Sequence, residues 1–423
     1  MYIFYSILLF LSLLVFIPIY FVRIRLFRRE SIFLKERLGL KLPQRSPLEE
    51  SIWIHAVSVG EVLSLQKLIK TIKERHPGWA VYFSTLTNSG MQVAKEKLKG
   101  VDQVFFIPLD FASVVRKFFE ALKPSLFVLA ESEFWPILLR EAKRRTRKVL
   151  LINGRISKHS FKRYSWFKFF AKKILSQIDI FLVQTEEDKM RLEKVGIDAG
   201  RVKVAKNLKS EIDLPLFSAD EIMRLKKSLG IAPTKKVIVA GSTRKGEERM
   251  LLEAYAEAKA KRDDLLLILA PRHPERGDEV KKLCNDFPFK SMRRTRLLPD
   301  KEWDILILDT LGELAQFYAL SDISFIGGSL VPWGGQNLLE PAFYQKPVFF
   351  GPHMENFAFL AGKFVQSAAA KVVHQEKDLV EIFLIQDERL LKEMGKRAKE
   401  TLNSLQGATE ETIKVIESLM QKS

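Results

Sequence analysis

The feature that most constrains the fold is an alternation of short hydrophobic strands and helix-like stretches, repeated in two successive series. The strands predicted for the first series are 51 to 57, 80 to 85, 102 to 107, 125 to 130, 148 to 152 and 179 to 183. Those predicted for the second series are 236 to 240, 265 to 270, 304 to 308, 322 to 326, 347 to 350 and 370 to 373. Such alternation predicts parallel sheets covered by helices. A chain of 423 residues is long enough for two of them.

We therefore predict the α/β class, with two Rossmann-like domains that face a cleft, since ligands of such folds bind outside the carboxyl ends of the strands. The alternation loosens around Pro215, which we interpret as a linker. The predicted segments are a membrane anchor at 1–22, a basic juxtamembrane segment at 23–50, a first domain at 51–206, the linker at 207–218, and a second domain with closing C-terminal helices at 219–423.

The N-terminus has the pattern of a membrane anchor helix. Tyr2 to Val22 carries no charged side chain, and four arginines follow at 23, 25, 28 and 29. About 20 apolar residues span a bilayer core, and the arginines predict a cytoplasmic body. A cleaved signal peptide is the alternative, but no positive charge precedes the apolar stretch. Pro18 leaves open a helix that enters only one leaflet.

The net charge of +18 indicates an anionic partner: nucleic acid, an anionic membrane surface or a phosphorylated substrate. No nucleic-acid-binding motif is present, so we predict no nucleic-acid partner. The run from Lys158 to Lys173 mixes aromatic and basic side chains, which predicts either a membrane-interfacial element or an amphipathic helix with core aromatics. The single Cys284 and six scattered histidines predict neither a disulfide framework nor a metal site.

The segment from Phe325 to Pro341, FIGGSLVPWGGQNLLEP, joins a predicted strand to a predicted helix. A strand that ends in two glycines lets the backbone approach a ligand, and the second pair, Gly334 and Gly335, is predicted to open a helix that favours an anion. Glu340 is then placed to hold a ribose diol. A glycine-rich turn before a helix is the alternative interpretation.

Polar or glycine-rich segments follow eight of the predicted strands, at the edge where these folds bind ligands. They are 58 to 61, 85 to 90, 131 to 136 and 153 to 155 in the first series, and 241 to 244, 271 to 276, 310 to 313 and 325 to 341 in the second.

Taken together, these segments resemble the 3-deoxy-D-manno-octulosonic acid (Kdo) transferases, inner-membrane enzymes that add Kdo to the lipid A precursor. The matching motifs, in the family's order, are HAVSVGE, ESEFWP, NGR, GSTR-x-GEE, PRHPER, GGS and GGQNLLEPA with FGPHMENF. The resemblance implies a GT-B glycosyltransferase fold, CMP-Kdo as donor, the lipid A precursor as acceptor, and inversion at the anomeric carbon without metal or cofactor. It also implies an inner-membrane location with the catalytic domains on the cytoplasmic face.

The resemblance places the catalytic base at Glu61, beside Ser58 and Gly60; the alternative is a first-turn glutamate stabilised by the helix dipole. We expect one of Glu131 and Glu133 to contact the sugar or the acceptor and favour Glu133. The residues Arg155 and Lys209 complete the set, with Lys209 as the cation for the sugar carboxylate or the phosphate. Lys206 replaces the family's usual glycine before Asn207, so the local turn is expected to differ.

For the donor we predict a cationic site, because the departing phosphate must be neutralised. Arg272 is the first choice for CMP, with Glu340 on the ribose hydroxyls. The full donor set is Gly241, Ser242, Thr243, Arg244, Arg272, His273, Gly312, Gly327, Gly328, Gly335, Asn337 and Glu340. Two alternatives stay open from the residues alone: a membrane-associated GT-B enzyme with a UDP-sugar donor, and a membrane-tethered scaffold with a degenerate site.

Overall fold

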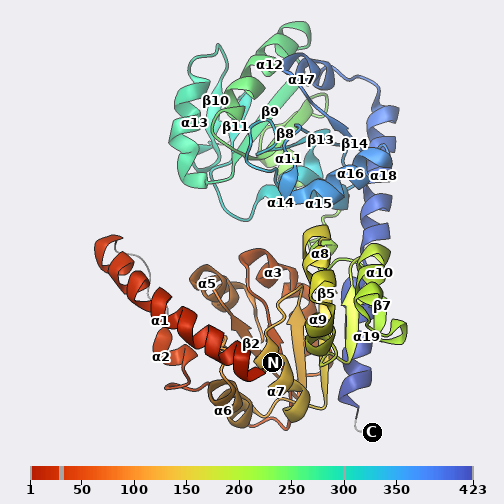
Figure 1. Cartoon of the computed structure of the whole chain (residues 1–423). Coiled ribbons are helices and arrows are strands. Elements are labelled where there is room, and N and C mark those ends of the chain that lie inside the picture. Colours follow the sequence, from red (N-terminus) through yellow and green to blue (C-terminus); the bar gives the residue numbers. More distant parts are fainter. Residues whose placement is uncertain (1, 28–32, 299–301, 422–423) are drawn as a thin grey trace. The chain divides into compact units, whose positions relative to one another are not determined.

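The computed structural model describes residues 2–27, 33–298 and 302–421, and the chain divides into two compact units (Figure 1). Unit 1 comprises Met1–Glu211 and Leu405–Ser423, and unit 2 comprises Ile212–Ser404. Each unit is described by itself. The observed boundary falls within the predicted linker, but the last 19 residues belong to unit 1 and not to the second domain as predicted.

In the described part of unit 1, seven parallel strands form one sheet in the order β3-β2-β1-β4-β5-β6-β7. The strands are β1 Glu50–His55, β2 Trp79–Thr85, β3 Gln103–Phe106, β4 Leu126–Ala130, β5 Lys148–Gly154, β6 Ile180–Val183 and β7 Val202–Val204. The six predicted strands are confirmed. The prediction missed β7, whose sequence VKV places a lysine between two valines and forms no continuous apolar run.

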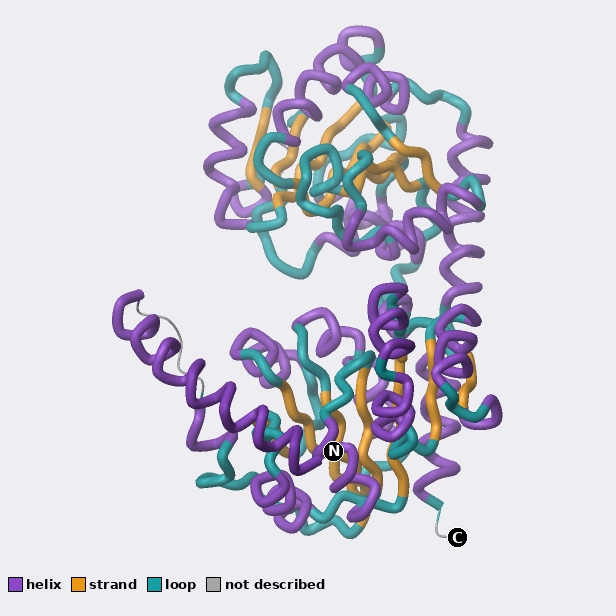
Figure 2. The backbone as a smooth tube through the Cα atoms, in the orientation of Figure 1, coloured by secondary structure: helices purple, strands orange, loops and turns teal. Residues whose placement is uncertain are grey.

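Helices flank the strands of unit 1 (Figure 2). Alternate residues of β1 enter different cores: Trp53 packs with Phe118 and Phe119, whereas Ile52 and Ile54 join the cluster on the other side. Both faces of the strand are apolar because both are covered. The helices are α1 Tyr2–Phe27, α2 Leu34–Arg37, α3 Val59–Ser64, α4 Gln66–Arg75, α5 Asn88–Lys97, α6 Ala112–Leu122, α7 Pro136–Arg145, α8 Lys158–Trp166, α9 Lys168–Leu175, α10 Glu186–Val195 and α19 Ala408–Met420.

Unit 2 repeats this plan with a parallel sheet ordered β10-β11-β9-β8-β12-β13-β14 in its described residues. Its strands are β8 Lys236–Thr243, β9 Leu265–Pro271, β10 Ser291–Arg293, β11 Ile305–Ile307, β12 Ile323–Ile326, β13 Val348–Phe350 and β14 Ala370–Val372. Its helices are α11 Ala219–Ser228, α12 Glu247–Lys261, α13 Gly277–Cys284, α14 Leu314–Leu320, α15 Leu339–Phe343, α16 Ala358–Gln366 and α17 Glu376–Phe383, with most of α18 Glu388–Leu405. The short edge strand β10 was not predicted.

The C-terminal helix α19 packs on unit 1 because its apolar face completes a core there. Ile413, Ile416 and Met420 are buried in the same cluster as Ile52 and Ile54. Glu211 strengthens the attachment, since its carboxylate accepts hydrogen bonds from backbone N–H groups at the start of α19.

The N-terminal helix α1 differs from the prediction. In the part of the chain that the structure describes, no helix has both the length and the hydropathy needed to cross a membrane. The predicted spanning anchor at 1–22 is therefore not supported. Tyr2 and Tyr5 instead pack against the core of unit 1, and the Arg140 guanidinium lies 4.7 Å from the centre of the Tyr2 ring. Two of the arginines in the predicted juxtamembrane cluster, Arg28 and Arg29, lie outside the described residues.

Candidate active site

Glu61 lies just beyond the carboxyl end of β1, in the first turn of α3. The Ser58 hydroxyl accepts a hydrogen bond from the Glu61 backbone N–H at 3.2 Å and donates one to Glu61 Oε1 at 2.8 Å. The backbone N–H of Val57 donates to Oε2 at 2.8 Å. The carboxylate is 8% exposed and is oriented by its own loop. Each carboxylate oxygen keeps acceptor capacity for a further hydrogen bond.

The loop that carries Glu61 is supported by neighbouring strand and helix ends. Thr85 and Thr87 donate hydroxyl hydrogen bonds to the Val57 carbonyl at 3.1 and 3.2 Å. A Cβ at Gly90 would lie 2.6 Å from the Thr85 hydroxyl oxygen, so the start of α5 packs against this loop only because residue 90 is glycine. Gly60 differs, since a Cβ there would meet no atom within 4 Å. Packing within the described residues therefore does not require a glycine at position 60.

Two residues in the left-handed region bring the 207–210 segment to this edge of the sheet. Glu131 follows β4 with φ +60°, and Asn153 ends β5 with φ +53°. The Glu131 carboxylate forms an ion pair with Lys209 at 2.5 Å, and the Asn153 side-chain oxygen accepts from the Leu208 N–H at 3.0 Å. Lys209 is therefore paired within unit 1. Asn153 was not among the predicted site residues, although asparagine tolerates this conformation better than most.

Glu133 completes a group of three carboxylates in unit 1. Burial raises its pKa, and the negative charges of Glu61 and Glu131 raise it further. A carboxyl group of this kind holds its proton to higher pH than a free glutamate and can then donate a hydrogen bond. Arg155, which follows β5, is exposed.

Lys206 adopts the backbone turn that a glycine favours, whereas the turn before Asn207 was expected to differ. Its φ is +62°, in the left-handed region. Its ammonium group donates to the Gln406 carbonyl at 2.8 Å. This bond joins the two segments of unit 1, close to where the first one ends at Glu211 and the second begins at Leu405.

In unit 2, the structure brings cationic side chains together at the carboxyl ends of β8 and β9. Arg244 Nη1 lies 3.0 Å from His273 Nε2, and its guanidinium lies 4.8 Å from the centre of the Trp333 ring. Burial lowers the pKa of Arg244, and the positive charges of Arg272 and Arg276 lower it further. An anion bound here would relieve this repulsion.

Glu340 and Asn337 lie within electrostatic reach of the same cations. Burial raises the pKa of Glu340, whereas a hydrogen bond from Asn337 and the positive charge of Arg272 oppose that rise. The Asn337 side chain also accepts from the Leu339 N–H at 3.1 Å, at the start of α15. Arg272 and Glu340 therefore lie near each other, and their role at a donor site stays a prediction.

Several predicted donor residues have a packing role in the sheet. A Cβ at Gly241 would lie 1.9 Å from the Tyr318 hydroxyl oxygen, and one at Gly327 would lie 2.5 Å from the Ser242 carbonyl oxygen. Ser242 has φ +58°. The buried Thr243 hydroxyl donates to Glu248 at 3.0 Å, so it is already used within the protein.

The backbone N–H groups at the first glycine pair, where the sequence predicted a close approach to a ligand, are occupied by a carboxylate. Glu247, in the first turn of α12, accepts from the N–H groups of Gly328, Ser329 and Leu330 at 2.5 to 2.9 Å, and from that of Arg244 at 2.8 Å. Its side chain is fully buried. The prediction passed over Glu247, although its place after Gly246 in a GEE motif was a usable signal.

The second glycine pair does not open a helix as predicted. Gly334 and Gly335 have φ +82° and +76° in an irregular segment, and α15 begins only at Leu339. A Cβ at Gly335 would lie 2.3 Å from the Met354 sulfur, which accounts for that glycine by packing. Gly312, with φ +83°, has no atom within 4 Å of its Cβ position. Among the residues that the structure describes, no cluster of three or more His, Cys, Asp or Glu side chains is arranged to hold a metal ion.

Comparison with known proteins places this geometry in a family. The family model for 3-deoxy-D-manno-octulosonic-acid transferase (kdotransferase) matches residues 33–212. The chain is 33% identical to a 3-deoxy-D-manno-octulosonic acid transferase of Rickettsia felis, over 80% of this chain and 72% of that protein. It is 34% identical to a bifunctional glycosyltransferase/methyltransferase of Fusobacterium nucleatum, over 78% of this chain but only about half, 52%, of that protein.

Solved structures confirm the architecture alone. A UDP-GlcNAc 2-epimerase from Neisseria meningitidis, bound to UDP-GlcNAc, matches 87% of this chain and 100% of its own with a TM-score of 0.56 at 13% identity. At that identity the likeness shows the fold, two parallel-sheet α/β domains with GT-B-like neighbours, and nothing finer.

Proposed function

Since the chain belongs to the Kdo transferases and is therefore a glycosyltransferase, we propose that it transfers Kdo from CMP-Kdo to the lipid A precursor, with inversion at the anomeric carbon and Glu61 as general base. The observation that carries the proposal is the Glu61 carboxylate, oriented by Val57 and Ser58 at the carboxyl edge of the unit 1 sheet.

The proposed step is a single displacement. Glu61 takes the proton of the acceptor hydroxyl, the hydroxyl oxygen bonds to C2 of Kdo, and the bond from C2 to the CMP phosphate breaks with its electron pair leaving on the phosphate. A positioned base contributes about 10²- to 10⁴-fold in such reactions. Glu133, with its raised pKa, orients an acceptor or sugar oxygen by donating a hydrogen bond.

The cationic side chains of unit 2 support an anionic donor. Arg244, Arg272 and His273 stabilise the departing phosphate, because charge that develops on a leaving group is best offset by preplaced cations. Glu340 and Asn337 accept hydrogen bonds from the ribose hydroxyls. Lys209 is assigned to orienting Glu131 and, when that ion pair opens, to the sugar carboxylate.

We propose that unit 1 binds an anionic membrane surface, on the cytoplasmic face of the inner membrane. Exposed apolar side chains support this on two elements: Ile3 and Phe4 of α1 are 79% and 66% exposed, and Trp166 and Phe169 in α8 and α9 are 73% and 71% exposed. Phe161, in contrast, packs on the core, so the run from 158 to 173 combines the two interpretations of its aromatics. Lysines interleave the exposed rings, as in interfacial elements.

The test is transfer of radiolabelled Kdo, with CMP-Kdo generated in the assay, to tetraacylated lipid A precursor, with products separated by thin-layer chromatography. Wild-type protein should yield product, Glu61→Gln should yield none above background, and the exposed control Glu74→Gln should match the wild type. If folded wild-type protein yields no product from CMP-Kdo but transfers sugar from a UDP-sugar, the donor is a UDP-sugar and not CMP-Kdo.

Membrane binding is tested by flotation with anionic vesicles. The Trp166→Ser, Phe169→Ser double variant should float less than the wild type. Unchanged flotation would show that α8 and α9 do not bind the membrane.

A further inference from the structure

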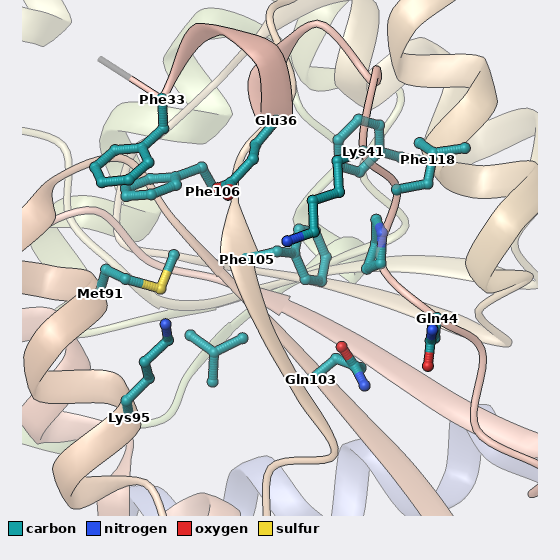
Figure 3. Close-up of a pocket in the computed structure, with 13 residues that line it drawn as sticks. Phe33, Glu36, Lys41, Gln44, Met91, Lys95, Gln103, Phe105, Phe106 and Phe118 are labelled. Atoms are coloured by element: carbon teal, nitrogen blue, oxygen red, sulfur yellow. The ribbon is translucent and has the colours of Figure 1, made fainter. Parts of the chain in front are cut away.

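A cavity of about 350 Å³ lies in unit 1 beside β3, the edge strand of the sheet (Figure 3). It is bounded by Phe33 and α2, the loop at residues 41–44, and one face of α5. This volume falls within the range of small-molecule sites, about 300–1,000 Å³. None of the predicted site residues lines the cavity.

Four phenylalanines form one part of the wall, and polar side chains that include Gln44 and Gln103 form another. The Phe33 and Phe106 rings are stacked with centroids 4.6 Å apart, and Phe33 holds the left-handed region at φ +47°. The centroid of the Phe105 ring lies 5.8 Å from that of Phe118, which is buried in the unit 1 core. Met91 adds a flexible thioether side chain, which adapts to apolar ligands. The cavity therefore offers an aromatic and aliphatic patch that adjoins the protein core at Phe118.

Two lysines give the cavity its charge. The side chains of Lys41 and Lys95 extend into it from opposite walls, and Glu36 is the single acid among its lining residues (Figure 3). Neither lysine forms an ion pair with any residue that the structure describes. Both are exposed. The cavity thus combines an aromatic and aliphatic patch with cations that are available to an anionic group.

Helix α5 connects the cavity to the loop of Glu61. The start of α5 packs against that loop at Gly90, whose Cβ position is 3.2 Å from the Val57 carbonyl oxygen. Met91 and Lys95, one turn apart on one face of the same helix, line the cavity. Phe106 is paired in register with Thr85, whose hydroxyl supports the Glu61 loop. A ligand in the cavity is therefore separated from the Glu61 loop by little more than one helical turn.

We propose that this cavity binds an acyl chain of the acceptor, with Lys41 and Lys95 pairing with the acceptor's phosphate. The inference rests on the proposed function for the identity of the ligand. The chemistry is that of an anionic amphiphile: the aromatic walls remove an alkyl chain from water, and the two ammonium groups select a phosphate over a neutral head group.

The first test measures binding without any sugar donor. Isothermal titration calorimetry of the full chain would use dodecyl phosphate and the neutral dodecyl maltoside as monomeric probes. Leu42→Trp fills the cavity from its rim and should weaken both probes about tenfold or more. Lys41→Ala with Lys95→Ala should weaken dodecyl phosphate to a similar degree and leave dodecyl maltoside nearly unchanged. Lys97→Ala, on the outer face of α5, is the matched control and should bind as the wild type does.

The second test measures transfer. In Leu42→Trp, KM for the tetraacylated acceptor should rise about tenfold while KM for CMP-Kdo stays constant, and a deacylated acceptor should be used equally by variant and wild type. If neither Leu42→Trp nor the double lysine variant weakens dodecyl phosphate binding, the cavity proposal is wrong. The proposed transfer reaction is not affected by that result. Binding that these variants weaken, in a protein that transfers no Kdo, would instead overturn the function and keep the cavity as an anionic amphiphile site.

Discussion

Glu61 and Glu247 occupy matching places in the two units. Each lies in the first turn of the helix that follows the first strand of its sheet in sequence, β1 in unit 1 and β8 in unit 2. Glu61 accepts two hydrogen bonds to its carboxylate, both from its own loop. Glu247 accepts four from backbone N–H groups, three of them more than 80 residues away in sequence, and is fully buried.

The difference teaches that the position of an acid at a strand end does not determine its role. A carboxylate whose acceptor sites are filled by backbone N–H groups stabilises a loop, because each bond it loses leaves a buried donor unpaired. A carboxylate with free acceptor capacity is available to a substrate. The number of internal donors, and not the motif, distinguishes the candidate base from the structural acid.

The largest expected effect tests the catalytic half of this comparison. Glu61→Gln keeps the shape of the side chain but cannot take a proton, so kcat should fall by about 10²- to 10⁴-fold. The unfolding midpoint and the affinity for CMP should stay close to those of the wild type. Steady-state transfer assays and calorimetry with CMP measure both. Retention of more than a tenth of the wild-type kcat would make Glu61 a structural acid like Glu247.

The reverse pattern is expected for Glu247→Gln. The new amide nitrogen faces backbone donors and loses their hydrogen bonds, so the free energy of unfolding should fall by about 3 kcal/mol. The segment at 328–330 loosens, and KM for the donor should rise more than kcat falls. Denaturant unfolding and donor kinetics separate the two effects. Glu257→Gln, on the exposed side of α12, is the control and should change stability by less than about 0.5 kcal/mol.

Asp110 extends the comparison to a buried acid of unit 1 that caps a helix. It accepts from the N–H groups of Ile137 and Leu138 at the start of α7, and burial raises its pKa to about 6. Between about pH 4 and 6 the folded state then binds more protons than the unfolded state, so stability should fall as pH rises across that window. Asp110→Asn should be less stable overall and should lack this slope. An equal slope in both proteins, from denaturant midpoints at pH 4 to 7, would contradict the assignment.

The smallest effect concerns the ion pair between Glu131 and Lys209. Both side chains are partly exposed, so their coupling free energy should be about 1 kcal/mol or less. A double-mutant cycle with Glu131→Gln and Lys209→Met measures it, both in stability and in transfer. If the coupling free energy in kcat clearly exceeds that in stability, the pair positions the substrate. If the two coupling free energies are equal, the pair only holds the 207–210 segment in place.

Much of the fold was predictable because its signals are local. Strands such as 80 to 85 and 265 to 270 carry continuous apolar runs, and the structure has strands at all twelve predicted places. The edge strands β7 and β10 escaped, since their sequences, VKV and SMR, form no continuous apolar run. The candidate site residues were predicted at strand ends for the same local reason, and Glu61, Glu131 and Glu133 do gather within unit 1.

What the sequence by itself determined was the alternation of elements, the family and the strand ends at which the candidate site residues lie. Only the tertiary structure decided which groups meet there: that Glu247 fills the amides at 328–330, that Lys209 pairs with Glu131, and that α19 returns to unit 1. The physical reason is range. A helix or strand shows its period within about 5 to 15 neighbouring residues. A hydrogen bond between distant segments forms only when folding brings those segments together, and no local sequence pattern predicts that pairing.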